Sequence, residues 1–189
     1  MREEKKVRCA WAESHALFIP YHDTEWGVPV HDDRLLFEML NLEGAQAGLS
    51  WLTILKRREQ YREAFDHFQA EIIVNYDVAK RAALLQNEGI IRNRLKIDAV
   101  VENALGFLAA AREYGSFDGY IWQFVSGRPL LDAEKSTARA KSELMSKELK
   151  KRGFRFVGPT ICYAFMQAVG MVNDHDAGCF RAKMLSHAR

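Results

Sequence analysis

Apolar residues recur at helical spacing along most of the chain, and polar residues mark where the helices begin. Apolar positions within 35–40 share one face of a predicted helix, for which Asp32 or Asp33 is the expected N-cap. A second helix is predicted to start after Ser50, and its apolar positions repeat as far as Phe65. Charged residues in this second segment fall on the opposite face, as is typical of a helix that packs against a core.

The same pattern continues to the C-terminal third of the chain. No alternation of apolar and polar residues competes with it, so the predicted fold class is all-α. At 189 residues the chain has room for one domain with a shared core, and we expect a single domain over 1–189. The further predicted helices cover 77–86, 97–115, 117–125, a stretch that ends at Lys151, and 160–169.

Composition excludes several classes of protein. With 48% hydrophobic and 28% charged residues the chain is expected to fold, and no apolar stretch approaches the ~20 residues of a membrane helix. The charged start, Met1 to Lys6, does not resemble a secretory signal, so we expect a cytoplasmic protein that binds no membrane. In that compartment the three cysteines are expected to be thiols or metal ligands.

The net charge of +2 hides an asymmetry along the chain. Residues 1–134 carry 16 Lys and Arg against 21 Asp and Glu, a net charge of −5, whereas residues 135–189 carry 11 against 4, a net charge of +7. Five of the positive charges lie within 147–155, which would attract a nucleic-acid backbone. Lysines in the last turn of a helix also complement the helix dipole, so charge alone leaves both interpretations open.

Sulfur and nitrogen donors stand near both ends of the chain. Cys9 and His22 lie near the start, and His175 and Cys179 are four residues apart near the end. An i, i+4 pair points both side chains to one side, and two cysteines with two histidines form a complete ligand set for structural zinc. Because the order of these residues matches no local zinc-finger spacing, four unrelated side chains remain the alternative.

A second candidate site combines aromatic rings with a carboxylate. Glu43 stands in the run 42–51, where two glycines and a glutamine are expected to interrupt a helix. Aromatic faces and one carboxylate suit a flat, cationic or amino-bearing ring, which stacks on the faces and donates N–H groups to the carboxylate. An aromatic core with a surface glutamate is the alternative. The aromatic candidates are Trp11, Phe18, Tyr21, Trp26 and Trp51.

Several sequence motifs made of uncommon residue combinations occur in a fixed order along the chain: Cys9-Ala10-Trp11, then 21–29, 42–51, 89–97, 151–158 and 172–175. Together they resemble the constitutive 3-methyladenine DNA glycosylase I family of bacteria, over about residues 8–180. Because several long motifs match in the same order, this resemblance is more specific than a match to a single short motif.

The resemblance implies an all-helical fold of the helix-hairpin-helix glycosylase superfamily. It implies that one structural zinc ion joins the two ends of the chain through Cys9, His22, His175 and Cys179. The partner implied is double-stranded DNA that contains alkylated bases, and we expect the protein to act as a monomer.

The resemblance also implies roles for the aromatic and acidic residues. Glu43 would accept hydrogen bonds from the alkylated adenine and act as the catalytic group, Trp51 would stack on the base, and Tyr21 would help fix its edge. The aromatic wall would be completed by Trp11 and Trp26. Phe18 stands where some relatives have a tyrosine, so it offers no hydroxyl contact.

Further residues are implied to contact the DNA. Gln46 and Leu49 would fill the gap that the extruded base leaves in the duplex. The hairpin would present backbone N–H groups of Val157 and Gly158 to a phosphate. The positive charge beside it would come from Lys150, Lys151, Arg152 and Arg155.

The expected reaction is hydrolytic excision of 3-methyladenine that leaves the abasic site uncut. Relatives that also cut the DNA carry a nucleophilic lysine after the hairpin, whereas this chain has Gly158-Pro159-Thr160. Asn173 stands where many relatives have a catalytic aspartate, and Asp174 is assigned no role. Two alternatives remain: a zinc-stabilised DNA-binding module without catalysis, and an enzyme that acts on soluble purines.

Overall fold

The computed structural model describes residues 6–131 and 134–186, and within these ranges all regular elements are helical. The all-α prediction is confirmed. Residues 1–5, which include most of the charged start, lie outside the described part. In chain order the elements are η1 (Ala10–Ser14), α1 (Phe18–Thr24), α2 (Asp33–Gln46), α3 (Trp51–Leu55), α4 (Arg58–Ala64), η2 (Asp66–Phe68), α5 (Ala70–Ile73), α6 (Val78–Gln86), α7 (Arg94–Tyr114), α8 (Phe117–Trp122), η3 (Gln123–Val125), α9 (Lys135–Lys151), α10 (Pro159–Ala168) and α11 (Phe180–Ser186).

Polar side chains cap the helices where the sequence pattern predicted their starts. The side chains of Asp32, Ser50 and Asp77 each accept a hydrogen bond from the backbone N–H three residues later, at the starts of α2, α3 and α6. Gly115 ends α7 as predicted, because its φ of 84° lies in the left-handed region that closes a helix.

The helix predicted from Ser50 to Phe65 is in fact two helices. The backbone leaves helical geometry at Arg57, with φ −110° and ψ 4°, and α4 begins at the next residue. The apolar spacing continues across this break because α3 and α4 both contribute buried residues, such as Ile54 and Tyr61, to the same core. Periodicity alone therefore did not reveal the break.

The two glycines of 42–51 have different structural roles. Gly48, with φ 77°, lies after the end of α2, whereas Gly44 lies within the helix and does not interrupt it as expected. A Cβ atom on Gly44 would lie 3.1 Å from the Cβ of Phe156. Glycine at 44 therefore lets the connection between α9 and α10 approach α2 closely.

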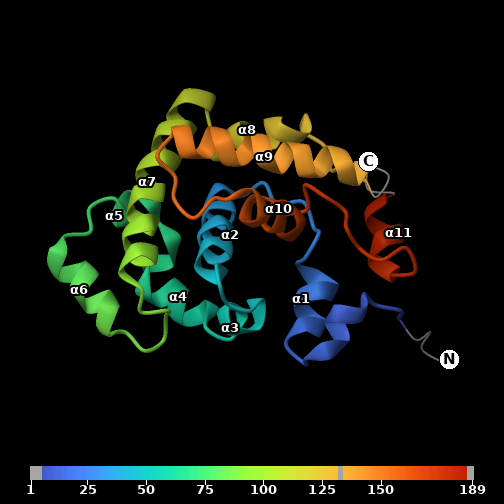
Figure 1. The fold of residues 1–189 in the computed structure, drawn as a ribbon, viewed down its shortest axis with the longest axis horizontal. Helices are drawn as coiled ribbons and strands as arrows, with labels where there is room; N and C mark the ends of the chain where they lie inside the picture. The colour runs from blue at the N-terminus through green and yellow to red at the C-terminus, as the bar shows by residue number, and fades with distance from the viewer. Residues whose placement is uncertain (1–5, 132–133, 187–189) are drawn as a thin grey trace.

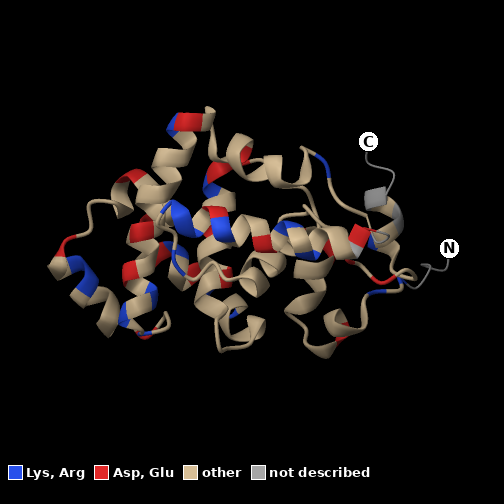
Figure 2. Ribbon diagram, turned by 45° about the horizontal axis from the view of Figure 1, so that its top comes forward, with Lys and Arg blue, Asp and Glu red and all other residues tan. Residues whose placement is uncertain are grey.

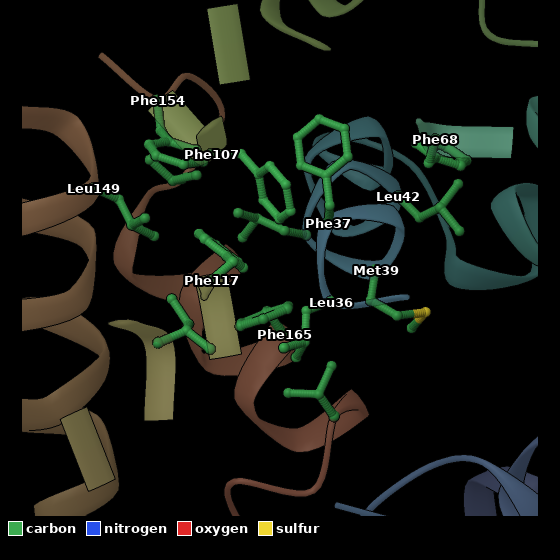
Figure 3. Packing of buried hydrophobic residues seen from close by; sticks show 14 of the residues in the cluster. Leu36, Phe37, Met39, Leu42, Phe68, Phe107, Phe117, Leu149, Phe154 and Phe165 are labelled. Atoms are coloured by element: carbon green, nitrogen blue, oxygen red, sulfur yellow. The ribbon is translucent and has the colours of Figure 1, made fainter. Parts of the chain in front are cut away.

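Helix α2 lies at the centre of the hydrophobic core (Figures 1 and 3). Its residues Leu36, Phe37 and Leu40 are fully buried, and they lie in one cluster with Phe107 of α7 and Phe165 of α10. Because α2 is covered on several sides, side chains around its circumference are buried, polar ones included.

The two ends of the described chain lie on the same side of the molecule, where α1 and α11 are neighbours (Figure 1). The backbone N–H of Phe180 donates to the carbonyl of Val7 at 2.9 Å. This hydrogen bond joins residues that are 173 positions apart in the sequence. No helix of the described part combines the length and apolar character that crossing a bilayer requires.

Candidate functional site

Glu43 lies in the last turn of α2 and is 3% exposed. Its Oε2 atom has no hydrogen-bond partner among the described residues. Burial raises the pKa of Glu43 to about 8. A buried carboxyl oxygen without a partner costs free energy, which indicates a group that is kept for a ligand. The alternative of a surface glutamate beside an aromatic core is therefore wrong.

Trp51 is the first residue of α3, and the cap at Ser50 fixes the start of that helix. Its indole Nε1 is also buried without a hydrogen-bond partner in the described part of the chain. The Trp51 ring lies 5.4 Å from the ring of Tyr21, with the two planes inclined at 42°. Burial, and next the charge of Glu43, raise the pKa of Tyr21, so its hydroxyl lies within electrostatic reach of that carboxylate.

Trp11 joins the remaining aromatic candidates into one wall. Its ring contacts Trp26 at 5.0 Å and Phe18 at 5.5 Å, both edge to face, and it lies 6.3 Å from Tyr21. The structure thus connects all five aromatic residues that the sequence singled out. Ring faces, one unsatisfied acceptor and one unsatisfied indole N–H suit a flat ring that carries both N–H donors and an acceptor.

The four sulfur and nitrogen donors converge although they come from opposite ends of the chain. The ligand atoms of Cys9, His22, His175 and Cys179 all lie within 4.8 Å of one another, and all four side chains are buried. Sγ of Cys9 lies 3.5 Å from Nδ1 of His175, and Sγ of Cys179 lies 3.4 Å from Nε2 of His22. Sulfur and nitrogen ligands of one tetrahedral zinc ion would lie about 3.5 Å apart, so this donor set fits that metal.

Neighbouring groups orient both imidazole rings. Nδ1 of His22 donates to Asp23 at 2.9 Å, and Asp23 is held in turn by two nitrogens of Arg8. Nε2 of His175 donates to the carbonyl of Trp26 at 3.2 Å. These bonds leave Nε2 of His22 and Nδ1 of His175 facing the thiols, which is the second-layer arrangement typical of metal-bound histidine.

The cluster of cysteines and histidines also contacts the aromatic wall. The ring of His175 lies 4.5 Å from Trp26, and the ring of His22 lies 5.4 Å from Trp11. A change in the cluster would therefore be transmitted directly to two rings of the pocket.

The segment 46–49 connects the helix that carries Glu43 to the helix that carries Trp51. Gln46 is the last residue of α2, three positions after Glu43, and Leu49 is 40% exposed just before α3. Leu49 is thus one of the large apolar side chains that the fold leaves at the surface, two residues before Trp51.

The connection between α9 and α10 runs as a tight hairpin. Phe156 has a φ of 53°, and the carbonyl of Val157 accepts a hydrogen bond from Ser146 at 2.6 Å. The Val157 side chain is buried, and Gly158 stands at the N-cap of α10. At Val157 and Gly158 this turn can therefore offer a ligand its backbone groups rather than its side chains.

Intramolecular carboxylates partner most of the basic residues beside the hairpin, and acidic positions are interspersed with basic ones along α9 (Figure 2). Arg152 binds Glu113 through two nitrogens, Arg155 binds Glu102, and Lys151 binds Glu148. Lys150 is exposed and has no carboxylate partner in the described ranges.

Sequence reasoning missed one buried polar bridge beside the site. Asn103 of α7 donates to Asn41 Oδ1 at 2.8 Å and accepts from the backbone N–H of Arg155 at 2.7 Å. It thereby joins the hairpin to α2, two residues before Glu43. An asparagine among apolar neighbours such as Val100 and Phe107 was the available signal.

Asn173 and Asp174 are both engaged in hydrogen bonds. The Asn173 amide donates to the carbonyl of Ala182 at 3.3 Å, and Asp174 accepts from Gln167 at 2.6 Å and from Tyr163 at 3.2 Å. These contacts give both residues a structural explanation.

Comparison with known proteins shows close relatives over most of the chain. Residues 11–182 match the family model described as methyladenine glycosylase. The chain is 47% identical over 177 residues to DNA-3-methyladenine glycosylase 1 of Escherichia coli, covering 91% of this chain and 95% of the relative. It is 45% identical over 178 residues to DNA-3-methyladenine glycosylase of Haemophilus influenzae, covering 92% of this chain and 96% of the relative.

Solved structures agree with these matches. A crystal structure of 3-methyladenine DNA glycosylase I superposes with a TM-score of 0.87 at 50% identity, over 92% of this chain and 98% of that one. A Staphylococcus aureus 3-methyladenine DNA glycosylase I, solved to show the basis of 3-methyladenine recognition, gives 0.86 at 35% identity over 92% and 95% of the two chains.

Proposed function

The chain belongs to the methyladenine glycosylase family, and from this membership and the pocket we propose that it excises 3-methyladenine from alkylated DNA. The observation that carries the proposal is the buried carboxyl group of Glu43, whose Oε2 lacks a partner in the described structure and which lies within electrostatic reach of Tyr21 in the aromatic wall. Relatives named for this activity share about half of the sequence.

Recognition in this pocket depends on charge as well as shape. Methylation at N3 gives the base of the nucleotide a positive charge, which an ionised Glu43 favours over neutral adenine. Trp51 and Tyr21 supply ring surfaces that every purine would use equally. Selectivity for the damaged base therefore rests on Glu43.

The bond to be broken needs little acid catalysis. When the N-glycosidic bond breaks, its electron pair passes to the base and neutralises it, so free 3-methyladenine leaves without prior protonation. Water then adds to the cationic sugar carbon and loses a proton, which leaves an abasic site. The protein extrudes the nucleotide, holds the base and excludes undamaged purines. Because Gly158-Pro159-Thr160 stands directly after the hairpin, where strand-cutting relatives carry a lysine, we propose a monofunctional enzyme that does not cut the strand.

We propose that Cys9, His22, His175 and Cys179 hold one structural zinc ion. Four protein ligands complete a tetrahedral site and leave no position for a reacting water, so the ion would contribute stability rather than chemistry. It would join the two ends of the chain and support Trp11 and Trp26 from behind.

We propose that the α9–α10 hairpin is the helix-hairpin-helix element that binds the DNA backbone. Backbone N–H groups at Val157 and Gly158 would contact a phosphate at the start of α10. Lys150 is the first basic candidate, and Lys151, Arg152 and Arg155 would contribute by exchanging a carboxylate partner for a phosphate. Gln46 and Leu49 would fill the gap in the duplex. One domain acting as a monomer in the cytoplasm remains our expectation.

The test is to incubate the protein with methylated duplex DNA and, separately, with methylated nucleosides, and to detect released 3-methyladenine by chromatography. Release from DNA is expected. Release from nucleosides alone would favour an enzyme of soluble purines, and binding without release would favour a DNA-binding module. Glu43→Gln should lose release, whereas Glu71→Gln, an exposed change on α5, should retain it.

A further inference from the structure

The segment 46–49 is held by a residue that lies about fifty positions further along the chain. Nζ of Lys96 lies 2.8 Å from the carbonyl oxygen of Ala45 and 2.7 Å from that of Ala47. These carbonyls lie at the C-terminal end of α2, where a helix leaves its acceptors without intrahelical donors. The two bonds bracket Gln46, so they fix the peptide from which its side chain projects.

The position of Lys96 is explained by α2 rather than by its own helix. Lys96 lies in the first turn of α7, where a positive charge opposes the dipole of that helix. At the C-terminal end of α2 the same charge is favourable. Among the described residues Lys96 has no carboxylate partner, and its side chain is half-buried. Burial also lowers the pKa of Lys96.

We propose that Lys96 is a positioning residue that holds the segment 46–49 in the conformation that fills the gap left by the extruded nucleotide. The inference rests on the proposed function and on the placement of Gln46 and Leu49 between Glu43 and Trp51. Two of the three ammonium N–H bonds are directed to α2. The main task of Lys96 is therefore to order the protein rather than to bind DNA.

A residue that positions the gap-filling segment should contribute most to excision when a base pair must be broken. In a paired duplex, residues that fill the gap stabilise the flipped state, which costs unpairing and unstacking energy. When the damaged adenine faces no base, that cost is smaller and the filling residues contribute less. Loss of Lys96 should therefore slow excision from a paired site more than from an unpaired site.

The experiment compares two substrates that share one methylated strand with a single adenine. Its complement carries either thymine or an abasic linker opposite the lesion, and released 3-methyladenine is followed under single-turnover conditions. Lys96→Met should lose about tenfold or more on the paired site relative to the unpaired site, the effect of losing charged hydrogen bonds. Lys96→Arg, which can still donate to both carbonyls, should recover most of that loss.

Lys80→Met is the matched control, because Lys80 lies on α6 in an ion pair with Asp66. Binding of free 3-methyladenine, followed by tryptophan fluorescence, should be unchanged in Lys96→Met. If that variant does not fold by circular dichroism, Lys96→Gln takes its place. Equal losses on both substrates, or no loss on either, would overturn the proposal. Failure of the unmodified protein to release any 3-methyladenine would instead reject the proposed function.

Discussion

At the scale of the single residue, Glu43 occupies surroundings that disfavour its charge. Burial holds the pKa of its carboxyl group at about 8, so at neutral pH the free protein carries it mainly in the protonated form. The ionised form is the one that attracts a cationic base. Substrate binding is therefore coupled to the loss of a proton from Glu43.

This coupling predicts the pH dependence of excision. Below about 8 the ionised fraction of Glu43 grows about tenfold per pH unit, and kcat/KM for release of 3-methyladenine should rise with it and level off above that value. The measurement is the initial rate on methylated duplex DNA between pH 6 and 9. Glu43→Gln serves as the control and should show a low rate that does not change with pH. A flat profile for the unmodified protein would contradict the role given to Glu43.

The residue types of the pocket and cluster were predictable from the sequence, but their environment was not. Glu43 and Trp51 stood out by their place in the run 42–51, yet periodicity does not say that each has a buried polar atom without a hydrogen-bond partner. That property depends on helices distant in sequence that cover α2. Lys96 was missed for the same reason, since its partners lie on another helix.

At the scale of the element, the hairpin and the pocket are joined by the buried amide of Asn103. The prediction is that Asn103→Ala lowers the free energy of unfolding by about 1–3 kcal/mol, because Asn41 and the N–H of Arg155 lose their partner. Denaturant unfolding measures this change. Asn75→Ala is the control, since Asn75 is exposed and its amide bonds only the carbonyl of Glu71 in its own turn, and it should change stability by about 0.5 kcal/mol or less. A similar effect of both substitutions would remove the special role of Asn103.

The ion pairs beside the hairpin change what its charge can do. Acidic residues of α7 neutralise Arg152 and Arg155, so the net charge of residues 135–189 overstates the field that DNA would meet. The sequence could not show this neutralisation, because Glu102 and Glu113 lie in residues 1–134, the acidic part of the chain. Helix caps and stops, in contrast, are local, and Asp77 and Gly115 were predicted correctly.

Lys150 should make the clearest electrostatic contribution to DNA binding. Lys150→Ala is expected to reduce the slope of log affinity against log salt concentration by about one, the change for one lost phosphate contact. Fluorescence anisotropy with abasic duplex DNA at several salt concentrations measures the slope. Lys80→Ala should leave it unchanged. An unaltered slope for Lys150→Ala would place the phosphate contact elsewhere.

At the scale of the whole molecule, the cluster of cysteines and histidines unites the two ends of the fold. Spacing suggested a zinc site with two ligands from each end, and the geometry of the four donors fits one tetrahedral ion. The family resemblance implied their convergence, but spacing alone could not show it, because it depends on how α1 and the segment before α11 dock. The four side chains lie together and are all buried, as a shared ligand set requires.

Metal analysis of the purified protein should find about one zinc per chain, and a chelator should lower the melting temperature. Cys179→Ser should lose the metal, because three ligands remain. Cys162→Ser is the control, since this third thiol is buried in the core away from the cluster and its loss should leave the metal content unchanged. Metal-free protein with an unchanged melting temperature in chelator would contradict the site.

With the proposed zinc ion bound, the meeting of both ends at the cluster would turn a linear chain into a ring of about 170 residues between Cys9 and Cys179. A ring tolerates a single cut. Cleavage by a protease in the exposed turn at Ser126–Arg128 would leave two fragments that each retain half of the ligand set, so they should stay associated until the metal is removed.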